Sequence, residues 1–362
     1  MLTFTKSVWG IILILILNCS VVKAQYDKHL QTGKSMLEQY EFTQAKEAFG
    51  LAIASQDAPA DNEAIKLRDT CNKRLQDTIF DIQFKSLTKI PESIADMKNL
   101  RHFLCGFNQL NSFPVGMSEL INLEELRAGP NPLYTLPPNF KNLQKLRILD
   151  LSQNRLTYFP LEVCELLNLE ILNLDNVHGH IPNSIGQLKK LTELSINYTD
   201  SEVLPIEIGR LENLSVLSLQ NNHFTEIPKQ IGHLKKLTNL NLTNNKLSEL
   251  PDELFDLDKL ETLNLQHNTL TAISPKIGQL KNLQFLSFGT NKLKTLPKEI
   301  GQLTNLQHLH LSSNELTTLP KEIGQLKKLK YLILYMNNFQ PDEVAKIRAL
   351  LPNCKVKLRL MD

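Results

Sequence analysis

The sequence has few aromatic residues, almost no net charge and little glycine or proline. Aromatic residues make up 6% of the 362 positions, with one tryptophan, which disfavours a carbohydrate cleft built from many rings. The formal net charge is +2 and the pI is about 8.1, so we expect neither a charged disordered tail nor a nucleic-acid binder with a strong positive field. Glycine (14) and proline (17) are too few for a collagen-like or low-complexity chain.

Cysteine is also scarce, and its spacing indicates no chemistry. Cys71, Cys105, Cys164 and Cys354 lie far apart in the sequence and match no zinc or redox motif. We expect isolated thiols that are buried as small apolar groups. A Cys71–Cys105 disulfide is the alternative. The fifth cysteine, Cys19, belongs to the N-terminal segment.

That N-terminal segment contains the longest apolar run of the chain. Lys6 precedes an apolar stretch over residues 8–17. Val22 and Ala24 occupy the −3 and −1 positions of a cleavage site. These are the parts of a secretory signal over residues 1–24, with cleavage after Ala24. The apolar stretch is too short to span a bilayer, which needs about 20 residues.

A lipoprotein signal is the first alternative, because Ile16-Leu17-Asn18 precedes Cys19. A retained anchor is the second. We predict an exported protein, which is periplasmic, on the cell surface or secreted, and which is held at a membrane only if Cys19 carries a lipid.

Leucine recurs with a fixed period over most of the remaining chain. The step is 23 residues, except for 22 between Leu169 and Leu191, and each unit follows the pattern L-x-x-L-x-L-x-x-N-x-L-x-x-L-P-x-x-I-x-x-L-x-x. The unit that begins at Leu306 fills this pattern completely. Counted from zero, the first leucine of each unit is Leu100, Leu123, Leu146, Leu169, Leu191, Leu214, Leu237, Leu260, Leu283, Leu306 or Leu329.

This pattern resembles the leucine-rich repeat family over about residues 78–362, and its period resembles that of many bacterial members. The resemblance implies an α/β fold: a right-handed leucine-rich repeat solenoid, or horseshoe, with a parallel β-sheet on its concave side. It also implies binding of a protein partner through the concave face, without catalysis. A surface adhesin or glycan-binding protein is the first alternative, and a substrate-selecting part of an effector or enzyme complex is the second.

The spacing has a direct physical explanation. Leucines at offsets 3 and 5 alternate with exposed residues, which predicts a short strand with one buried face. A single unit cannot bury its leucines, so units must stack and their strands must join. The asparagine at offset 8 can bond backbone groups that lose partners at the following turn. These asparagines are Asn108, Asn131, Asn154, Asn222, Asn245, Asn268, Asn291, Asn314 and Asn337.

Two neighbouring units break the asparagine series. Val177 and Thr199 occupy the positions where the other units have asparagine. We expect a local change of curvature there. A loop near residues 175–203 shaped for a partner is the alternative.

Both ends of the array need caps. Residues 25–77 lack the repeat and predict a helical hairpin over 27–55 and a third helix over 60–77. Gly33, Phe42 and the alanines after it resemble a tetratricopeptide repeat, although Met36 replaces the usual aromatic residue. We expect this region to cap the repeats of residues 78–339, with a second docking surface or dimer contact as the alternative. Residues 340–362, with a helix from Pro341 and a last strand, form the predicted C-terminal cap.

No catalytic, cofactor or metal motif is found. Thr32-Gly33-Lys34-Ser35 matches only the end of a phosphate-binding loop, and no zinc-protease, nucleophile-elbow, C-x-x-C or calcium-loop pattern occurs. His308 and His310 point the same way from one predicted strand, but no third metal ligand is near in the sequence. We expect them, like His178 and His180, to be solvated polar groups.

The remaining candidate is the concave surface itself. Its outward positions change from charged to polar and then to aromatic along the array, while lysine pairs lie on the back. Sugars would bind at the amides of Gln220, Asn241 and Asn264 if the glycan alternative holds. The predicted partner-binding residues are Tyr198, Gln220, Asn241, Asn264, Phe285, His308, His310, Tyr331 and Tyr335.

Overall fold

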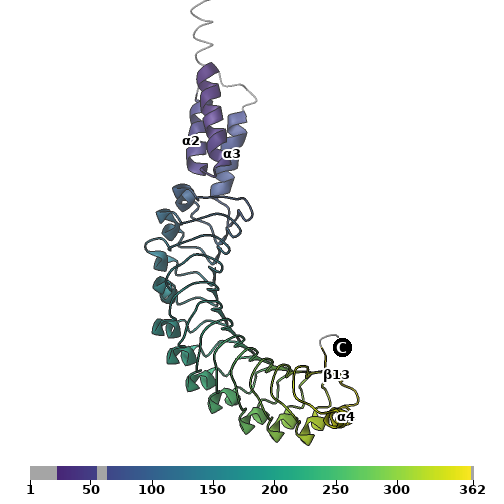
Figure 1. Ribbon diagram of the computed structural model, residues 1–362. Helices are drawn as coiled ribbons and strands as arrows, with labels where there is room; N and C mark the ends of the chain where they lie inside the picture. Colours follow the sequence, from purple (N-terminus) through teal and green to yellow (C-terminus); the bar gives the residue numbers. More distant parts are fainter. Residues whose placement is uncertain (1–22, 55–62, 360–362) are drawn as a thin grey trace, which may run out of the picture.

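The computed structural model describes residues 23–54 and 63–359. They form one curved solenoid with a helical region at its N-terminal end (Figure 1). Most of the predicted signal segment, including Cys19, lies outside the described residues. In the described part of the chain, no helix is long and apolar enough to cross a membrane.

A single parallel sheet lines the inner curve, which confirms the predicted fold class. In the described residues it has 13 strands, and their spatial order follows the sequence. Equivalent residues of successive units lie opposite each other, so that Leu309 pairs with Leu286 on one side and Leu332 on the other. The strands are β1 Ile79–Asp81, β2 His102–Leu104, β3 Glu125–Arg127, β4 Ile148–Asp150, β5 Ile171–Asn173, β6 Glu193–Ser195, β7 Val216–Ser218, β8 Asn239–Asn241, β9 Thr262–Asn264, β10 Phe285–Ser287, β11 His308–His310, β12 Tyr331–Ile333 and β13 Lys355–Lys357.

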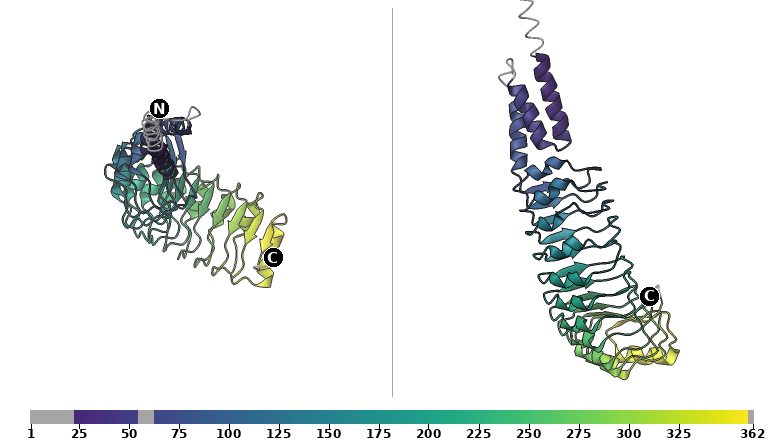
Figure 2. Two further views of the ribbon diagram at one scale, coloured as in Figure 1. Left: turned by 90° about the horizontal axis from the view of Figure 1, so that it is seen from above. Right: turned by 90° about the vertical axis from the view of Figure 1, so that its left-hand side faces the viewer.

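Short 3₁₀ turns occupy the outer curve (Figures 1 and 2). The proline directly before such a turn holds an extended conformation, as at Pro320 with φ −62° and ψ 141°. The turns are η1 Glu92–Asp96, η2 Val115–Glu119, η3 Phe140–Asn142, η4 Leu161–Glu165, η5 Asn183–Gln187, η6 Ile206–Arg210, η7 Lys229–His233, η8 Asp252–Asp256, η9 Pro275–Gln279, η10 Lys298–Gln302 and η11 Lys321–Gln325.

The repeat leucines fill the space between the sheet and the outer turns. Leu306, Leu309, Leu311 and Leu326 are all buried, and the same holds for their equivalents in the other units. One apolar core runs without interruption from Phe42 to Leu351. Burial is therefore shared between neighbouring units, as the period requires.

The asparagines at offset 8 form the predicted ladder. Asn314 donates from Nδ2 to the carbonyls of Leu311 (3.1 Å) and Phe288 (2.9 Å), and its Oδ1 accepts from the amide of Leu293 (3.0 Å). Each such amide therefore satisfies backbone groups of two successive units. The equivalent bonds recur at the other ladder asparagines, including Asn108 and Asn337.

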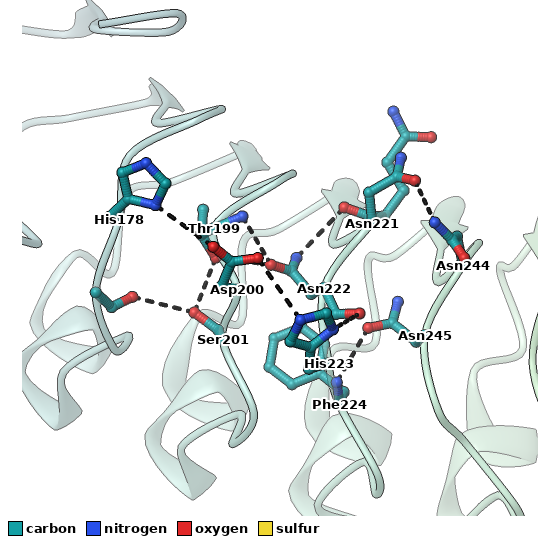
Figure 3. Close-up of polar contacts among 12 residues, drawn as sticks. His178, Thr199, Asp200, Ser201, Asn221, Asn222, His223, Phe224, Asn244 and Asn245 are labelled. Carbon is teal, nitrogen blue, oxygen red and sulfur yellow. Dashed lines mark hydrogen bonds and ion pairs between the residues drawn. The ribbon is translucent and has the colours of Figure 1, made fainter. Parts of the chain in front are cut away.

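A different network replaces the ladder where asparagine is missing (Figure 3). The Thr199 hydroxyl bonds Asn222 Oδ1 (2.7 Å) and Ser201 Oγ (2.8 Å), and Ser201 in turn donates to the carbonyl of Gly179 (3.2 Å). On the same rim, Asp200 lies between His178 (3.5 Å) and His223 (3.6 Å). Side-chain bonds thus bridge three units that lack the regular amide contacts.

The N-terminal region is helical, with boundaries close to those expected. Residues 23–38 form a first helix, followed by α2 Phe42–Ile53 and α3 Glu63–Leu75. Gly33 is required there because a Cβ would overlap the ring of Phe49. The tetratricopeptide-like interpretation itself stays a prediction.

An aromatic contact joins this helical region to the first repeats. The ring of Phe42 packs edge-on against Phe80 (5.8 Å between centroids), and Phe80 stacks on Phe103 (5.7 Å). Ser93 of η1 donates to a carboxylate oxygen of Glu41 (2.9 Å). These contacts cover the end of the repeat core.

At the other end, α4 Pro341–Leu350 and β13 follow the last repeat. Ile347 and Leu351 are buried against the core, and Val356 packs partly on it. Strand β13 pairs with β12 so that Tyr331 lies opposite Lys355 and Ile333 opposite Lys357.

All four cysteines in the described residues are free thiols, so the Cys71–Cys105 alternative is wrong. Cys71 belongs to the core of the helical region, whereas Cys105 lies in the repeat core. Burial raises the pKa of both thiols. They serve as small apolar groups, as expected.

Candidate partner-binding face

Five of the predicted residues lie together on β10, β11, β12 and the turn after β12. We call Phe285, His308, His310, Tyr331 and Tyr335 the concave cluster. Because side chains alternate along each strand, the central leucine points into the apolar core. The residues on either side of it point toward the inner curve of the solenoid. The parallel register then sets equivalent side chains in rows across the strands.

One row consists of rings stacked along the sheet. The centroids of Phe285 and His308 are 6.1 Å apart, and those of His308 and Tyr331 are 5.1 Å apart with their planes at 14°. Lys355 continues the row, with Nζ 5.7 Å from the Tyr331 centroid. Because His308 and Lys355 come from opposite neighbours of β12, both faces of Tyr331 are in contact.

The three aromatic side chains of the cluster are less exposed than expected. Phe285, Tyr331 and Tyr335 occupy predicted outward positions of the concave surface, but each is partly buried. Stacking against neighbours in the row removes part of each ring from solvent. The cluster therefore presents mainly ring edges and polar ends to the inner curve.

His310 is the most tightly held member of the cluster. Its Nδ1 lies 2.8 Å from the Gln266 amide nitrogen and its Nε2 lies 2.6 Å from Ser312 Oγ. The Gln266 amide can only donate, so the neutral imidazole carries its proton on Nε2. Burial, assisted by the nearby His267, lowers the pKa of His310. This imidazole is fixed in orientation, contrary to the solvated group that we expected.

Ser287 lies beside this contact and is completely buried, although its position points toward the inner curve. Its hydroxyl has no hydrogen-bond partner among the described residues. A buried hydroxyl without a partner is costly.

The remaining predicted residues lie outside the cluster. Gln220 accepts a hydrogen bond at Oε1 from Asn241 Nδ2 (3.1 Å), and Asn264 accepts the amide of Gln266 (3.2 Å). Tyr198 stands on the rim with φ 56° and about half of its surface exposed, four strands before β10. Tyr198 is thus not part of the same surface.

The structure gathers no metal-binding group among the described residues. His308 packs against Tyr331, and His178 faces Asp200, which lies between it and His223. His180 is exposed.

Two features of the surface were missed in the sequence. Lys355 and Lys357 extend the concave face, since β13 pairs with β12. They were missed because the repeat period ends after Phe339, so the sequence does not show their register. Phe84 and Phe107 stack at 4.3 Å on the N-terminal rim and are 69% and 51% exposed. Both stand at offset 7, where most other units have small or polar residues and only Tyr198 is also aromatic, and that difference could have revealed them.

Comparison with known proteins agrees with this architecture. A family model described as a leucine-rich repeat region matches residues 129–223, 206–292 and 271–352, which together exceed half of the chain. The chain belongs to the leucine-rich repeat family. A search of curated proteins finds no match.

Solved structures of the same family are similar over most of the chain. A leucine-rich repeat protein of Leptospira interrogans is 39% identical, with 75% of this chain and 76% of that chain covered and a TM-score of 0.66. The ectodomain of the receptor kinase GASSHO1/SCHENGEN3 from Arabidopsis thaliana, solved with CASPARIAN STRIP INTEGRITY FACTOR 2, is 32% identical (74% and 37% covered, TM-score 0.63). An internalin from Listeria monocytogenes shares the fold at 23% identity (79% and 88% covered, TM-score 0.65). The chain spans little more than a third of the plant ectodomain.

Proposed function

We propose that this chain is a non-catalytic protein-binding module whose partner contacts the concave cluster. The observation that carries the proposal is the ordered row from Phe285 to Tyr331, in which aromatic side chains are held by stacking yet keep part of their surface open. Rings held in this way lose little conformational entropy on binding, and such residues dominate the energetics of interfaces.

The similar receptor ectodomain was solved with a bound factor, which supports binding as the class of function. The helical region acts as a cap in this proposal, since Phe42 and Glu41 contact the first repeats. Export through the N-terminal signal, with lipidation at Cys19 as the alternative, would present the module outside the cytoplasm.

Glycan binding is the less favoured function. Sugars pack against open ring faces, but both faces of Tyr331 and one face of His308 are already in contact with neighbours. The amides of Gln220 and Asn241 are bonded to each other. Protein binding uses ring edges and hydroxyls without this restriction.

The proposal is tested by capture from the host envelope and medium. The mature chain from Gln25 is cross-linked beside a variant with Phe285, His308, Tyr331 and Tyr335 changed to alanine. A control variant changes Lys235 and Lys236, on the outer curve, to alanine. We expect one specific partner to be captured by the unmodified chain and the control but lost from the cluster variant. Equal capture by all three chains would contradict the proposed site.

A further inference from the structure

We propose that the partner segment is extended and polarised, with carboxylate side chains seated at the C-terminal end of the concave face. This inference rests on the proposed function and adds the chemistry of the partner. It follows from the distribution of charged side chains along the inner curve. The strand order of the sheet assigns each of these side chains to a strand.

Among the residues that the structure describes, the acidic side chains of the concave face belong to its first half. Their charge is largely uncompensated there, apart from Glu125, which bonds His102 (2.9 Å) and Arg127. Partial burial alone would raise the pKa of Glu125, but hydrogen bonds from His102 and Arg127 outweigh it and lower the pKa. The acidic residues at concave positions of β1–β6 and the turns after them are Asp81, Glu125, Asp150, Asp175 and Glu193.

The second half has the opposite character. From Val216 of β7 to Tyr335, none of the described outward positions on the strands or at offset 6 is acidic. Beyond them, Lys355 and Lys357 project from β13 on the same side as Tyr331 and Ile333. Neither ammonium has a carboxylate partner within the described residues.

The aromatic row favours the same ligand. Lys355 Nζ lies over the face of Tyr331, so the ring holds the ammonium at the end of the row. Ring edges carry partial positive charge, and these edges, not the faces, are what the row offers. Tyrosine hydroxyls can donate to carboxylate oxygens. The cationic end and the ring edges thus form one surface complementary to anionic groups.

The length of the segment follows from the sheet. From Asp150 on β4 to Lys357 on β13 there are nine strand steps, which at roughly 4.8 Å each span about 43 Å. An extended peptide covers this with about 13 residues. Carboxylates at one end would meet Lys355 and Lys357, while basic residues at the other end would meet Asp150 and Asp175.

The test uses a synthetic 14-residue peptide probe with four glutamates at one end, four lysines at the other and serine and asparagine between. A benzophenone next to the glutamates allows cross-linking, and binding is measured by fluorescence anisotropy. We expect the benzophenone to react near residues 331–357. We expect Lys355→Glu/Lys357→Glu to weaken binding at least about ten-fold in low salt, and Lys355→Gln/Lys357→Gln to weaken it less.

The matched control is Lys327→Glu/Lys328→Glu, which makes the same charge change after η11 on the outer curve. It should alter binding less than two-fold, and thermal unfolding of every variant establishes that it is folded. Equal losses in the two charge-reversal variants, cross-links on the outer curve, or no probe binding to the unmodified chain at millimolar concentration would overturn the inference. If the cross-linked partner of the previous section is lost from the cluster variant but kept by Lys355→Glu/Lys357→Glu, the function stands and this inference fails.

Discussion

The side chain of Gln266 reaches across an entire strand to His310. Its amide nitrogen lies 2.8 Å from His310 Nδ1, although β10 separates their units. The contact is formed above Gly289, which has no side chain, and beside the small, buried Ser287. A built Cβ at Gly289 would lie only 3.2 Å from His310 Nε2. Glycine at this position therefore permits the contact that orients His310.

We predict that Gly289→Thr displaces His310 and lowers the free energy of unfolding by about 1–2 kcal/mol through overcrowding. Urea unfolding followed by circular dichroism measures the change. Gly50→Ala is the control, because a Cβ there meets no atom within 4 Å in the middle of α2. That substitution should stabilise the chain by up to about 1 kcal/mol. An unchanged midpoint for Gly289→Thr would show that the contact does not depend on glycine.

A pH dependence follows from the lowered pKa of His310, which burial and His267 hold below its ordinary value of 6.5. Well above pH 6.5 the imidazole of His310 is neutral in both the folded and the unfolded chain. As the pH falls below 6.5, the unfolded chain takes up a proton first, so stability decreases until the folded pKa is passed. Urea midpoints across this range should show a shallower decline for His310→Gln. The control His233→Gln, on the outer curve, should retain the original decline; identical curves for both variants would refute the prediction.

We predict that removing one asparagine of the ladder lowers the free energy of unfolding markedly. Asn314→Ala leaves the carbonyls of Leu311 and Phe288 and the amide of Leu293 without their partner. We expect a loss of about 3 kcal/mol, because buried backbone groups without partners cost about 1–3 kcal/mol each and relax only in part. Asn338→Ala, at an exposed position of the next unit, should change stability by less than about 0.5 kcal/mol. Similar unfolding midpoints for the two variants would contradict the role of the ladder.

We predict that weakening the contact between the helical region and the first repeats makes the N-terminal strands open first. Phe42→Ala removes the ring that packs against Phe80, and we expect a loss of about 3–4 kcal/mol with early hydrogen exchange in β1 and β2. Leu51→Ala, on the exposed side of α2, should have little effect. If exchange in β1 and β2 were unchanged by Phe42→Ala, the helical region would not act as a cap.

Much of the fold could be predicted because the repeat has one physical explanation at every unit. The leucines at offsets 3 and 5 and the asparagine at offset 8 require only their own period, so Leu309 and Asn314 could be placed without coordinates. The helices at both ends of the array also followed from composition and spacing.

The candidate site was less predictable, because its contacts depend on what neighbouring units lack. The contact between Gln266 and His310 depends on Gly289, and the stacking that partly buries Tyr331 depends on His308 and Lys355. The bonds among Thr199, Ser201 and Gly179 replace a missing amide in a way that no period indicates. Lys357 escaped notice because its strand lies beyond the last regular repeat.

Hydroxyl-radical footprinting of the complex with the captured partner tests most directly whether the concave cluster is the binding site. Oxidation of Tyr331, Tyr335 and Phe285 should fall several-fold on binding, because these partly open rings would be covered. Tyr158, which is 80% exposed on another edge, reports general changes and should be oxidised equally with and without partner. Protection of Tyr158 or of the helical region, with unchanged oxidation of Tyr331 and Tyr335, would contradict binding at the concave cluster.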